Sequence, residues 1–187
     1  MERLRLFIAV DVGGDVPHRY ESVIGNLKWL GNSSRIKWID PGNLHLTLKF
    51  LGSTPVEALP VLETILKDIA ANHRAFFITL AGLGMFSTRQ RTQVLWADVQ
   101  EGKTELERIA AELDQSLGEL GIPREPRAFA AHLTLGRAKD RSFTREALNK
   151  LKGFPFGTTP ISELVLFESQ TLPAGAVYRA LVRARLA

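Results

Sequence analysis

HLTLKFLG, residues 45–52, and HLTLGR, residues 132–137, decide how this chain of 187 residues is expected to fold. Both open with the same four letters, and in both of them apolar residues alternate with polar ones, which is typical of a half-buried β-strand. Side chains at positions i and i+2 share one face of a strand. Each stretch is therefore predicted to turn its leucines toward a core and its histidine and threonine toward the other face.

The first stretch predicts a strand over 44–51. If the alternation is strict, His45, Thr47 and Lys49 share the polar face. The opposite face then holds the residues that pack into the core: Leu44, Leu46, Leu48 and Phe50. A single His-x-Thr pair is more often structural than functional, so this stretch alone indicates only a half-buried strand.

The second stretch predicts a strand over 131–137 with His132 and Thr134 on one face. Strict alternation sends Arg137 to the core side, but Gly136 permits a bulge or a strand end that would return Arg137 to the polar face. The alternative is an ordinary surface arginine at a strand end. Since two of the four histidines occupy matched strings, the repetition favours a functional pair.

The hydrophobic periodicity of the remaining chain predicts an α+β fold. Further strands are expected over 4–11, 35–39, 76–83, 93–99, 162–168 and 177–186, and helices over 17–30, 56–71, 103–120 and 145–151. No linker rich in Pro, Ser or Gly divides the chain. We therefore expect one domain over residues 1–187, built as two lobes with two sheets of mainly antiparallel strands.

The composition narrows the class of protein. No apolar run approaches the roughly 18 residues of a membrane span, so no membrane association is expected. The chain has no cysteine, which excludes disulfides and thiolate zinc sites and fits a cytoplasmic protein. The net charge of +4 suits an anionic partner but also an ordinary solvated surface. Basic residues gather at 124–145 and at 89–91, and such clusters attract phosphate without selecting a base sequence.

Two opposed imidazoles can supply one general base and one general acid, because an imidazole titrates near neutrality. Two threonine hydroxyls can bind the oxygens of a phosphate. In-line displacement at phosphorus places the nucleophile and the leaving group on opposite sides, which matches one histidine on each side. Zinc ligation is the competing use of paired histidines, but HExxH is absent, and His18 and His73 do not repeat the motif. We expect no metal and no cofactor.

The tandem His-x-Thr arrangement resembles the two-histidine (2H) phosphoesterase superfamily, and more narrowly the RNA 2′,3′-cyclic phosphodiesterase, or 2′-5′ RNA ligase, family. The strings that carry the resemblance span nearly the whole chain: RLFIAVDV, KWIDPGNLHLTLKFLG, QVLWADV, AHLTLGR and LFESQTLPAGAVY. The resemblance implies a bilobal fold with two pseudo-symmetric sheets and a central cleft. It also implies hydrolysis of a terminal RNA 2′,3′-cyclic phosphate to a 2′-phosphate without metal or cofactor, by a protein that we expect to be monomeric.

Carried over by position, the resemblance implies that His45 protonates the departing ribose O3′ and that His132 activates water. It likewise implies that Thr47 and Thr134 hold the phosphate oxygens and that Arg137 contacts the substrate. The division between acid and base stays open, because the reverse, ligating direction would exchange the two roles.

Two further points stay open at this stage. Phe7, Trp38 and Phe129 are candidates for stacking on a terminal base, although each is more often a core residue, and Trp96 is interpreted as core. The rival functions are an RNA-end binding protein with slow or vestigial activity, and a phosphodiesterase for 2′-5′ linkages or small cyclic phosphates. Intact histidines favour the enzyme.

Overall fold

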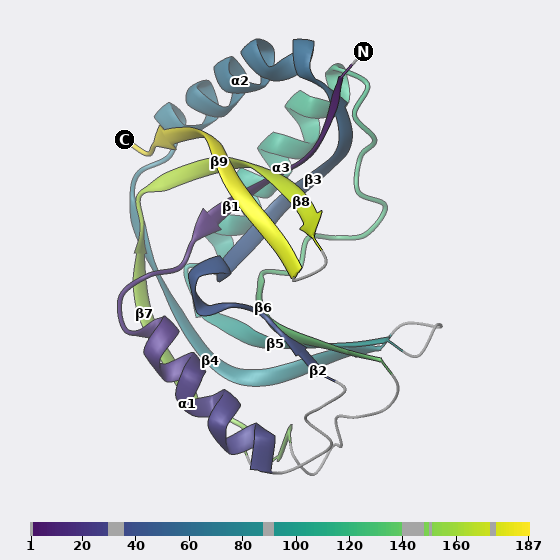
Figure 1. Cartoon of the computed structure of the whole chain (residues 1–187). Coiled ribbons are helices and arrows are strands. Elements are labelled where there is room, and N and C mark those ends of the chain that lie inside the picture. The colour runs from purple at the N-terminus through teal and green to yellow at the C-terminus, as the bar shows by residue number, and fades with distance from the viewer. Residues whose placement is uncertain (1, 30–35, 88–91, 140–147, 150, 173–174) are drawn as a thin grey trace.

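The computed structural model (Figure 1) describes residues 2–29, 36–87, 92–139, 148–149, 151–172 and 175–187, and this part of the chain forms two antiparallel sheets. The four-stranded sheet has the order β3 (His45–Pro55), β1 (Arg3–Asp11), β8 (Glu163–Leu172), β9 (Gly175–Arg185). The five-stranded sheet has the order β2 (Ile36–Trp38), β6 (His132–Lys139), β5 (Thr92–Glu101), β4 (Phe76–Ser87), β7 (Pro155–Ile161). Each sheet therefore holds one of the two HLTL strands, and the predicted α+β class is confirmed.

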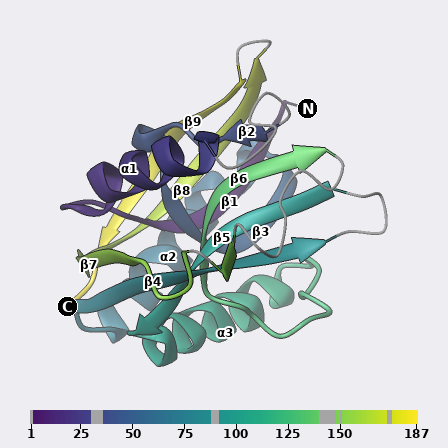
Figure 2. The ribbon, with the colours of Figure 1, turned by 90° about the horizontal axis from the view of Figure 1, so that it is seen from below.

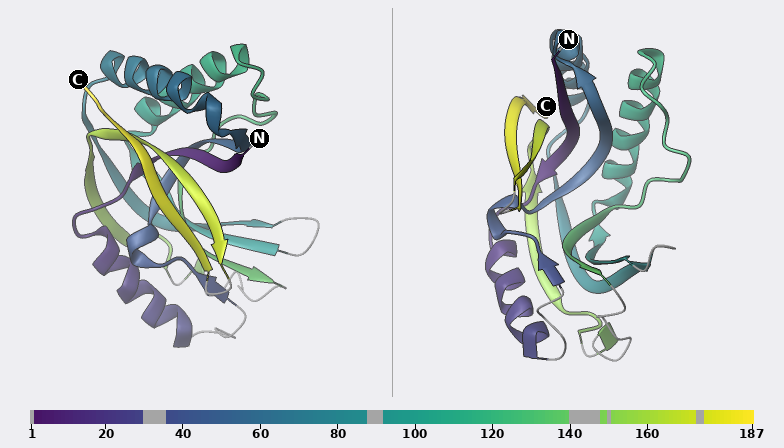
Figure 3. Two further views of the ribbon diagram at one scale, coloured as in Figure 1. Left: turned by 45° about the horizontal axis from the view of Figure 1, so that its top comes forward. Right: turned by 45° about the vertical axis from the view of Figure 1, so that its right-hand side comes forward.

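In the part of the chain that the structure describes, three helices lie at the two ends of the molecule: α1 (Val16–Trp29), α2 (Leu59–Asn72) and α3 (Lys103–Glu119). Helix α1 packs beside β7, α2 beside β8 and β9, and α3 beside β3 and β5. Figure 3 shows α1 at one end and α2 and α3 at the other, with the sheets between them, and Figure 2 shows α1 and α3 on opposite sides when the molecule is seen from below. Short 3-10 turns, η2 (Pro41–Asn43) and η3 (Val56–Ala58), lead into β3 and α2.

The leucines of the two motif strands lie in one continuous core, as predicted. Leu46 and Leu48 of β3 and Leu133 and Leu135 of β6 are buried in the same cluster. The apolar stripe of α3 completes that cluster with Leu106, Ile109, Leu113 and Leu117. The two sheets are thus joined through shared apolar burial, which is the dominant favourable contribution to folding.

The hydrophobic periodicity of the sequence did not predict strand β7. Strand β7 reads PFGTTPI, and its two prolines and glycine are typical of a loop. Among the described strands, β7 pairs with β4 alone and lies at the edge of the five-stranded sheet. A proline is tolerated at such an edge, because no second neighbouring strand needs its backbone hydrogen bond. The predicted helix over 145–151 and the basic residues Arg89 and Arg91 lie largely or wholly outside the described residues.

The prediction of strict alternation along β3 is wrong beyond Thr47. In the pairing with β1, Thr47 lies opposite Ala9 and Lys49 lies opposite Ile8, so Leu48 is an extra, unpaired residue, and Leu51 is skipped in the same way. The bulge at Leu48 reverses the face of the residues that follow it, up to the second bulge at Leu51. Phe50 is consequently 57% exposed rather than in the core.

Lys49 is turned inward by the same bulge and is only 2% exposed. Its Nζ donates to Asp114 Oδ1 of α3 at 2.5 Å and to the Pro123 carbonyl at 2.7 Å. The Glu125 amide donates to the same Asp114 oxygen at 3.0 Å. The hydrogen bond from Lys49 lowers the pKa of Asp114 more than partial burial raises it. Lys49 therefore ties β3 to α3 and to the segment that leads toward β6.

Asp114→Ala should destabilise the protein by about 3–5 kcal/mol, because it leaves a buried ammonium without its counter-charge. Lys49→Met should cost less, since it removes the charge and keeps the apolar stem. The Lys49–Asp114 contribution should persist above about pH 3.8, the ordinary pKa of Asp, and be lost as the pH falls through the lowered pKa of folded Asp114. Urea unfolding at several pH values measures these differences.

The matched control is Glu63→Ala, which breaks the exposed Lys67–Glu63 pair of α2 and should cost at most about 1 kcal/mol. An Asp114→Ala cost as small as that of Glu63→Ala would contradict the role of the buried pair.

Candidate active site

A cleft of about 1280 Å³ lies between the two sheets and takes its walls from both. It is lined by all five residues that the sequence singled out: His45, Thr47, His132, Thr134 and Arg137. The leucines between these residues are buried behind them. Strands β3 and β6 lie beside each other, so residues far apart in the sequence meet across one space.

The two half-sites repeat each other in register. In the first sheet, His45 lies opposite Asp11 and Thr47 opposite Ala9. In the second sheet, His132 lies opposite Asp98 and Thr134 opposite Trp96. Each histidine thus pairs with an aspartate of the neighbouring strand, and each threonine follows two residues later on the same face.

The imidazoles are held in the same way. His45 Nδ1 lies 2.7 Å from the Asn43 carbonyl, and His132 Nδ1 lies 2.6 Å from the Ala130 carbonyl, in each case two residues upstream. A carbonyl only accepts, so each Nδ1 carries a proton and donates it. The neutral form of each ring then keeps its lone pair on Nε2, which is the atom left for chemistry.

Burial lowers the pKa of both imidazoles below 6.5. The upstream carbonyl raises the pKa of each ring in part, and the Arg137 guanidinium lowers both. Among the described residues, the Asp11 carboxylate also raises the pKa of His45, whereas no carboxylate raises the pKa of His132. At His45, the Asp11 carboxylate therefore offsets part of the effect of burial on the pKa.

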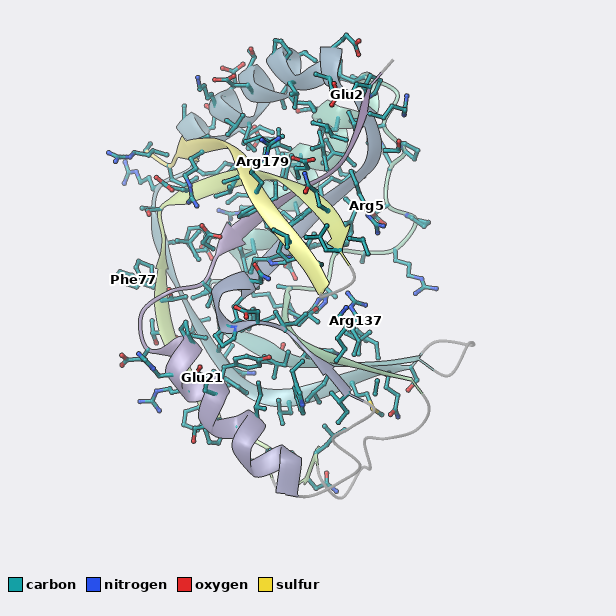
Figure 4. The ribbon with its side chains drawn as sticks, viewed as in Figure 1. Glu2, Arg5, Glu21, Phe77, Arg137 and Arg179 are labelled. Carbon is teal, nitrogen blue, oxygen red and sulfur yellow. The ribbon has the colours of Figure 1, made fainter. Side chains whose placement is uncertain are left out.

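Arg137 enters the cleft because β6 bulges where β3 does. Trp96 lies opposite Thr134 and Leu95 lies opposite Gly136, so Leu135 is the extra residue. This confirms that a bulge beside Gly136 returns Arg137 to the face of His132. Figure 4 shows Arg137 on the side of β6 that faces the other sheet. Because both strands bulge after the threonine, Phe50 of β3 occupies the position that Arg137 has in β6.

Aromatic rings surround His45. The Phe7 ring lies 4.9 Å from its imidazole, and the Tyr178 ring stands edge-on to it at 5.1 Å and 87°. Phe7 packs in a small second cluster with Phe167 and Tyr178, beside the cleft. These rings limit the freedom of the imidazole and cover part of it from solvent.

His132 has a matching aromatic neighbour in Phe86, whose ring stands edge-on at 5.1 Å and 89°. Trp96 lies 6.1 Å from His132 and is only half-buried, so the interpretation of Trp96 as a plain core residue is wrong. Of the proposed stacking residues, Phe7 and Phe129 line the cleft, whereas Trp38 packs against the main core.

Three of the cleft residues that the sequence did not indicate are aromatic: Phe50, Phe86 and Tyr178. Strand β4 was predicted to end before Phe86, and nothing in the pattern around Tyr178 distinguishes a cleft-facing aromatic residue from a core one. The other two histidines lie elsewhere. His18 is 3.8 Å from Glu21, and His73 is 2.7 Å from Glu112.

Within the described ranges, no three His, Cys, Asp or Glu side chains are placed to share a metal ion. The same part of the chain has no helix that is long and apolar enough to cross a membrane.

Comparison with known proteins gives one consistent family. The model of the 2′-5′ RNA ligase superfamily matches residues 17–171. A curated relative from Archaeoglobus fulgidus, named RNA 2′,3′-cyclic phosphodiesterase, is 33% identical over 94% of this chain and 97% of its own. TT0787 of Thermus thermophilus is similar in structure with a TM-score of 0.80 and 27% identity, and the match covers 98% of both chains. E. coli LigT complexed with 3′-AMP has a TM-score of 0.80 and 26% identity over 100% of this chain and 99% of its own.

We expect both cleft imidazoles to carry their proton on Nδ1 when neutral and to titrate below 6.5, because each donates to a carbonyl and each is buried. Long-range proton–nitrogen NMR spectra recorded across the pH range report both properties, with His45→Gln and His132→Gln assigning the signals. A neutral form protonated on Nε2, or titration above the ordinary histidine value, would contradict this geometry.

Proposed function

This chain belongs to the 2′-5′ RNA ligase superfamily, and from that premise we propose that it hydrolyses the terminal 2′,3′-cyclic phosphate of RNA to a 2′-phosphate. The observation that carries the proposal is the pair of imidazoles, one from each sheet, that share a cleft with two threonine hydroxyls. The names of its curated relatives support the substrate. Since one chain contains both half-sites, we propose that residues 1–187 act as a single domain and as a monomer.

The proposed reaction balances with two imidazoles. His132 Nε2 accepts a proton from water as the water oxygen attacks phosphorus. The bond between phosphorus and O3′ breaks, and His45 donates its Nε2 proton to O3′. The products are a 3′-hydroxyl and a 2′-phosphate, and a proton transfer through solvent restores the starting forms. Thr47 and Thr134 donate hydrogen bonds to the non-bridging oxygens, where negative charge grows.

Two differences between the half-sites support His45 as the acid. The Asp11 carboxylate raises the pKa of His45 and so favours the protonated ring there. The departing O3′ belongs to the ribose, which must lie on the side where the base binds. Phe50 offers an exposed aromatic face on the β3 side, whereas the same position in β6 holds Arg137. The nucleoside then lies toward β3, and the attacking water lies toward β6.

Arg137 supplies a positive charge beside the two imidazoles. Its guanidinium can bind a phosphate oxygen with charge-assisted hydrogen bonds. It lies close enough to both imidazoles to lower the pKa of each. We therefore propose that Arg137 contacts the phosphate between them, in agreement with the expectation from its sequence position.

The size of the cleft supports an RNA end as the substrate. Its volume of about 1280 Å³ exceeds the roughly 300–1,000 Å³ of ordinary small-molecule sites. Arg5 of β1 and Arg127 of the segment before β6 also line it and offer contacts to the phosphates of further nucleotides.

His45→Ala and His132→Ala should each reduce turnover of an oligoribonucleotide with a 2′,3′-cyclic phosphate by at least about 10²-fold, since each removes one proton-transfer group. Product analysis by mass spectrometry and phosphatase sensitivity should identify a 2′-phosphate. His18→Ala is the matched control, because His18 is exposed outside the cleft, and it should keep the wild-type rate.

Other outcomes of this assay select the rival functions. Tight binding of the RNA end without turnover by the wild type would indicate an RNA-end binding protein. Cleavage of a linear 2′-5′ linkage with an inert cyclic phosphate would change the substrate. Loss of activity in EDTA that zinc restores would replace the acid–base mechanism with metal chemistry.

Phe50→Ala should raise KM about tenfold with a smaller change in kcat, because stacking on a base contributes roughly 1–3 kcal/mol of binding that is kept in the transition state. Phe77→Ala is the matched control: Phe77 is 65% exposed, and Figure 4 shows it on the other side of the molecule from Arg137. Steady-state kinetics on the same RNA compare the two. An equal effect of both substitutions would remove Phe50 from the binding site.

A further inference from the structure

We propose that Tyr20 is a positioning residue, whose hydroxyl holds the β6 bulge in the form that turns Arg137 into the cleft. Tyr20 belongs to α1 and is fully buried, and it is not among the residues that line the cleft. It therefore acts through another residue. The inference rests on the proposed role of Arg137 in binding the phosphate.

The contacts of Tyr20 converge on the bulged residue. Its Oη lies 2.8 Å from the Leu135 carbonyl and 2.5 Å from the Ile39 carbonyl, and its single proton is shared between them. The Ile39 amide donates to the same Leu135 carbonyl at 3.0 Å. Leu135 is the residue that the register between β5 and β6 leaves unpaired. Its carbonyl thus receives two donors from outside that strand pair.

The bulge in β6 determines on which face of the strand the Arg137 side chain lies. If Leu135 took a regular place in the pairing, every later residue of β6 would change face, and Arg137 would turn from the cleft toward the core. Unsatisfied buried carbonyls are costly, so the donors at the Leu135 carbonyl favour the bulged form over a regular strand. The direction of the Arg137 side chain therefore depends on the Tyr20 hydroxyl of α1, which contacts β6 from outside the cleft.

The hydroxyl is suited to a permanent role of this kind. Burial raises the pKa of Tyr20 above its ordinary value, so the group stays a proton donor throughout the working pH range. The equivalent bulge in β3 differs: among the described residues, no side-chain hydroxyl donates to the Leu48 carbonyl. In β3 the residue that the bulge turns toward the cleft is Phe50. An apolar contact of Phe50 requires less precise orientation than the directional hydrogen bonds of an arginine guanidinium.

A double-mutant cycle tests the inference on wild type, Tyr20→Phe, Arg137→Ala and the double variant, with RNA ending in a 2′,3′-cyclic phosphate. Tyr20→Phe removes only the hydroxyl and should lower kcat/KM roughly tenfold, because small misplacements of a positioning group are expensive. In the Arg137→Ala background the same substitution should lower kcat/KM no further. The melting temperature should fall by the same amount in both backgrounds, since that cost does not pass through Arg137.

Additive losses of kcat/KM, or an undiminished rate in Tyr20→Phe, would overturn the inference. Failure of the proposed function is distinguishable, because wild type would then leave the cyclic phosphate intact, or Arg137→Ala alone would have no effect. Thr159→Val is the matched control: it removes another buried hydroxyl, which accepts from the Gly13 amide at 3.2 Å, and it should lower stability but keep the wild-type kcat/KM.

Gly136→Ala keeps the test decisive if Tyr20→Phe does not fold. A methyl group at Gly136 would come within 3.0 Å of the Trp38 ring, so it strains the same bulge from β2. Its loss of kcat/KM should likewise disappear in the Arg137→Ala background. A loss of equal size in both backgrounds would overturn the link between the bulge and Arg137.

Discussion

The period of two along a β-strand is the constraint on which the cleft depends. A strand offers alternate side chains to each face, so a histidine and a threonine two residues later enter the cleft together. A third group at the fifth position after the histidine belongs on the other face. One unpaired leucine after each threonine removes this conflict. The two bulges thus bring a third residue into each half-site without lengthening either motif.

The half-sites hold their histidines alike but present different side chains beyond the bulge. Each imidazole donates to the carbonyl two residues upstream and has an aromatic edge at the same distance. Beyond the bulge, β3 presents Phe50 and β6 presents Arg137. A symmetric pair of histidines would bind an in-line substrate equally well in either direction. In the proposed function, the aromatic face of Phe50 on one side and the guanidinium of Arg137 on the other give the substrate one favoured orientation.

The sequence predicted those features that depend on the alternation within one strand. It did not predict those that depend on the register between two neighbouring strands. The strand character and core leucines of both motifs follow from alternation alone, and they were predicted. The bulge in β6 was anticipated because Gly136 marks it. In β3 the bulged Leu48 is followed by Lys49 rather than by a glycine, so the sequence gives no indication of a bulge. For this reason both Lys49 and Phe50 were assigned to the wrong face. Bulges are set by the register with a neighbouring strand, which a single strand's pattern does not contain.

Burial of the cleft has opposite consequences for the two proposed roles. A lowered pKa suits His132, because a base must begin neutral, but it works against His45, because an acid must begin protonated. The substrate resolves this difference in the proposed mechanism. A cyclic phosphate is an anion, and an anion placed beside a buried imidazole raises its pKa. In the proposed mechanism, His45, whose pKa the Asp11 carboxylate also raises, is the ring that gains the proton when the phosphate binds. The low polarity of the cleft, which keeps the free rings neutral, also strengthens this attraction. In the proposed mechanism, the bound substrate therefore promotes protonation of its own general acid.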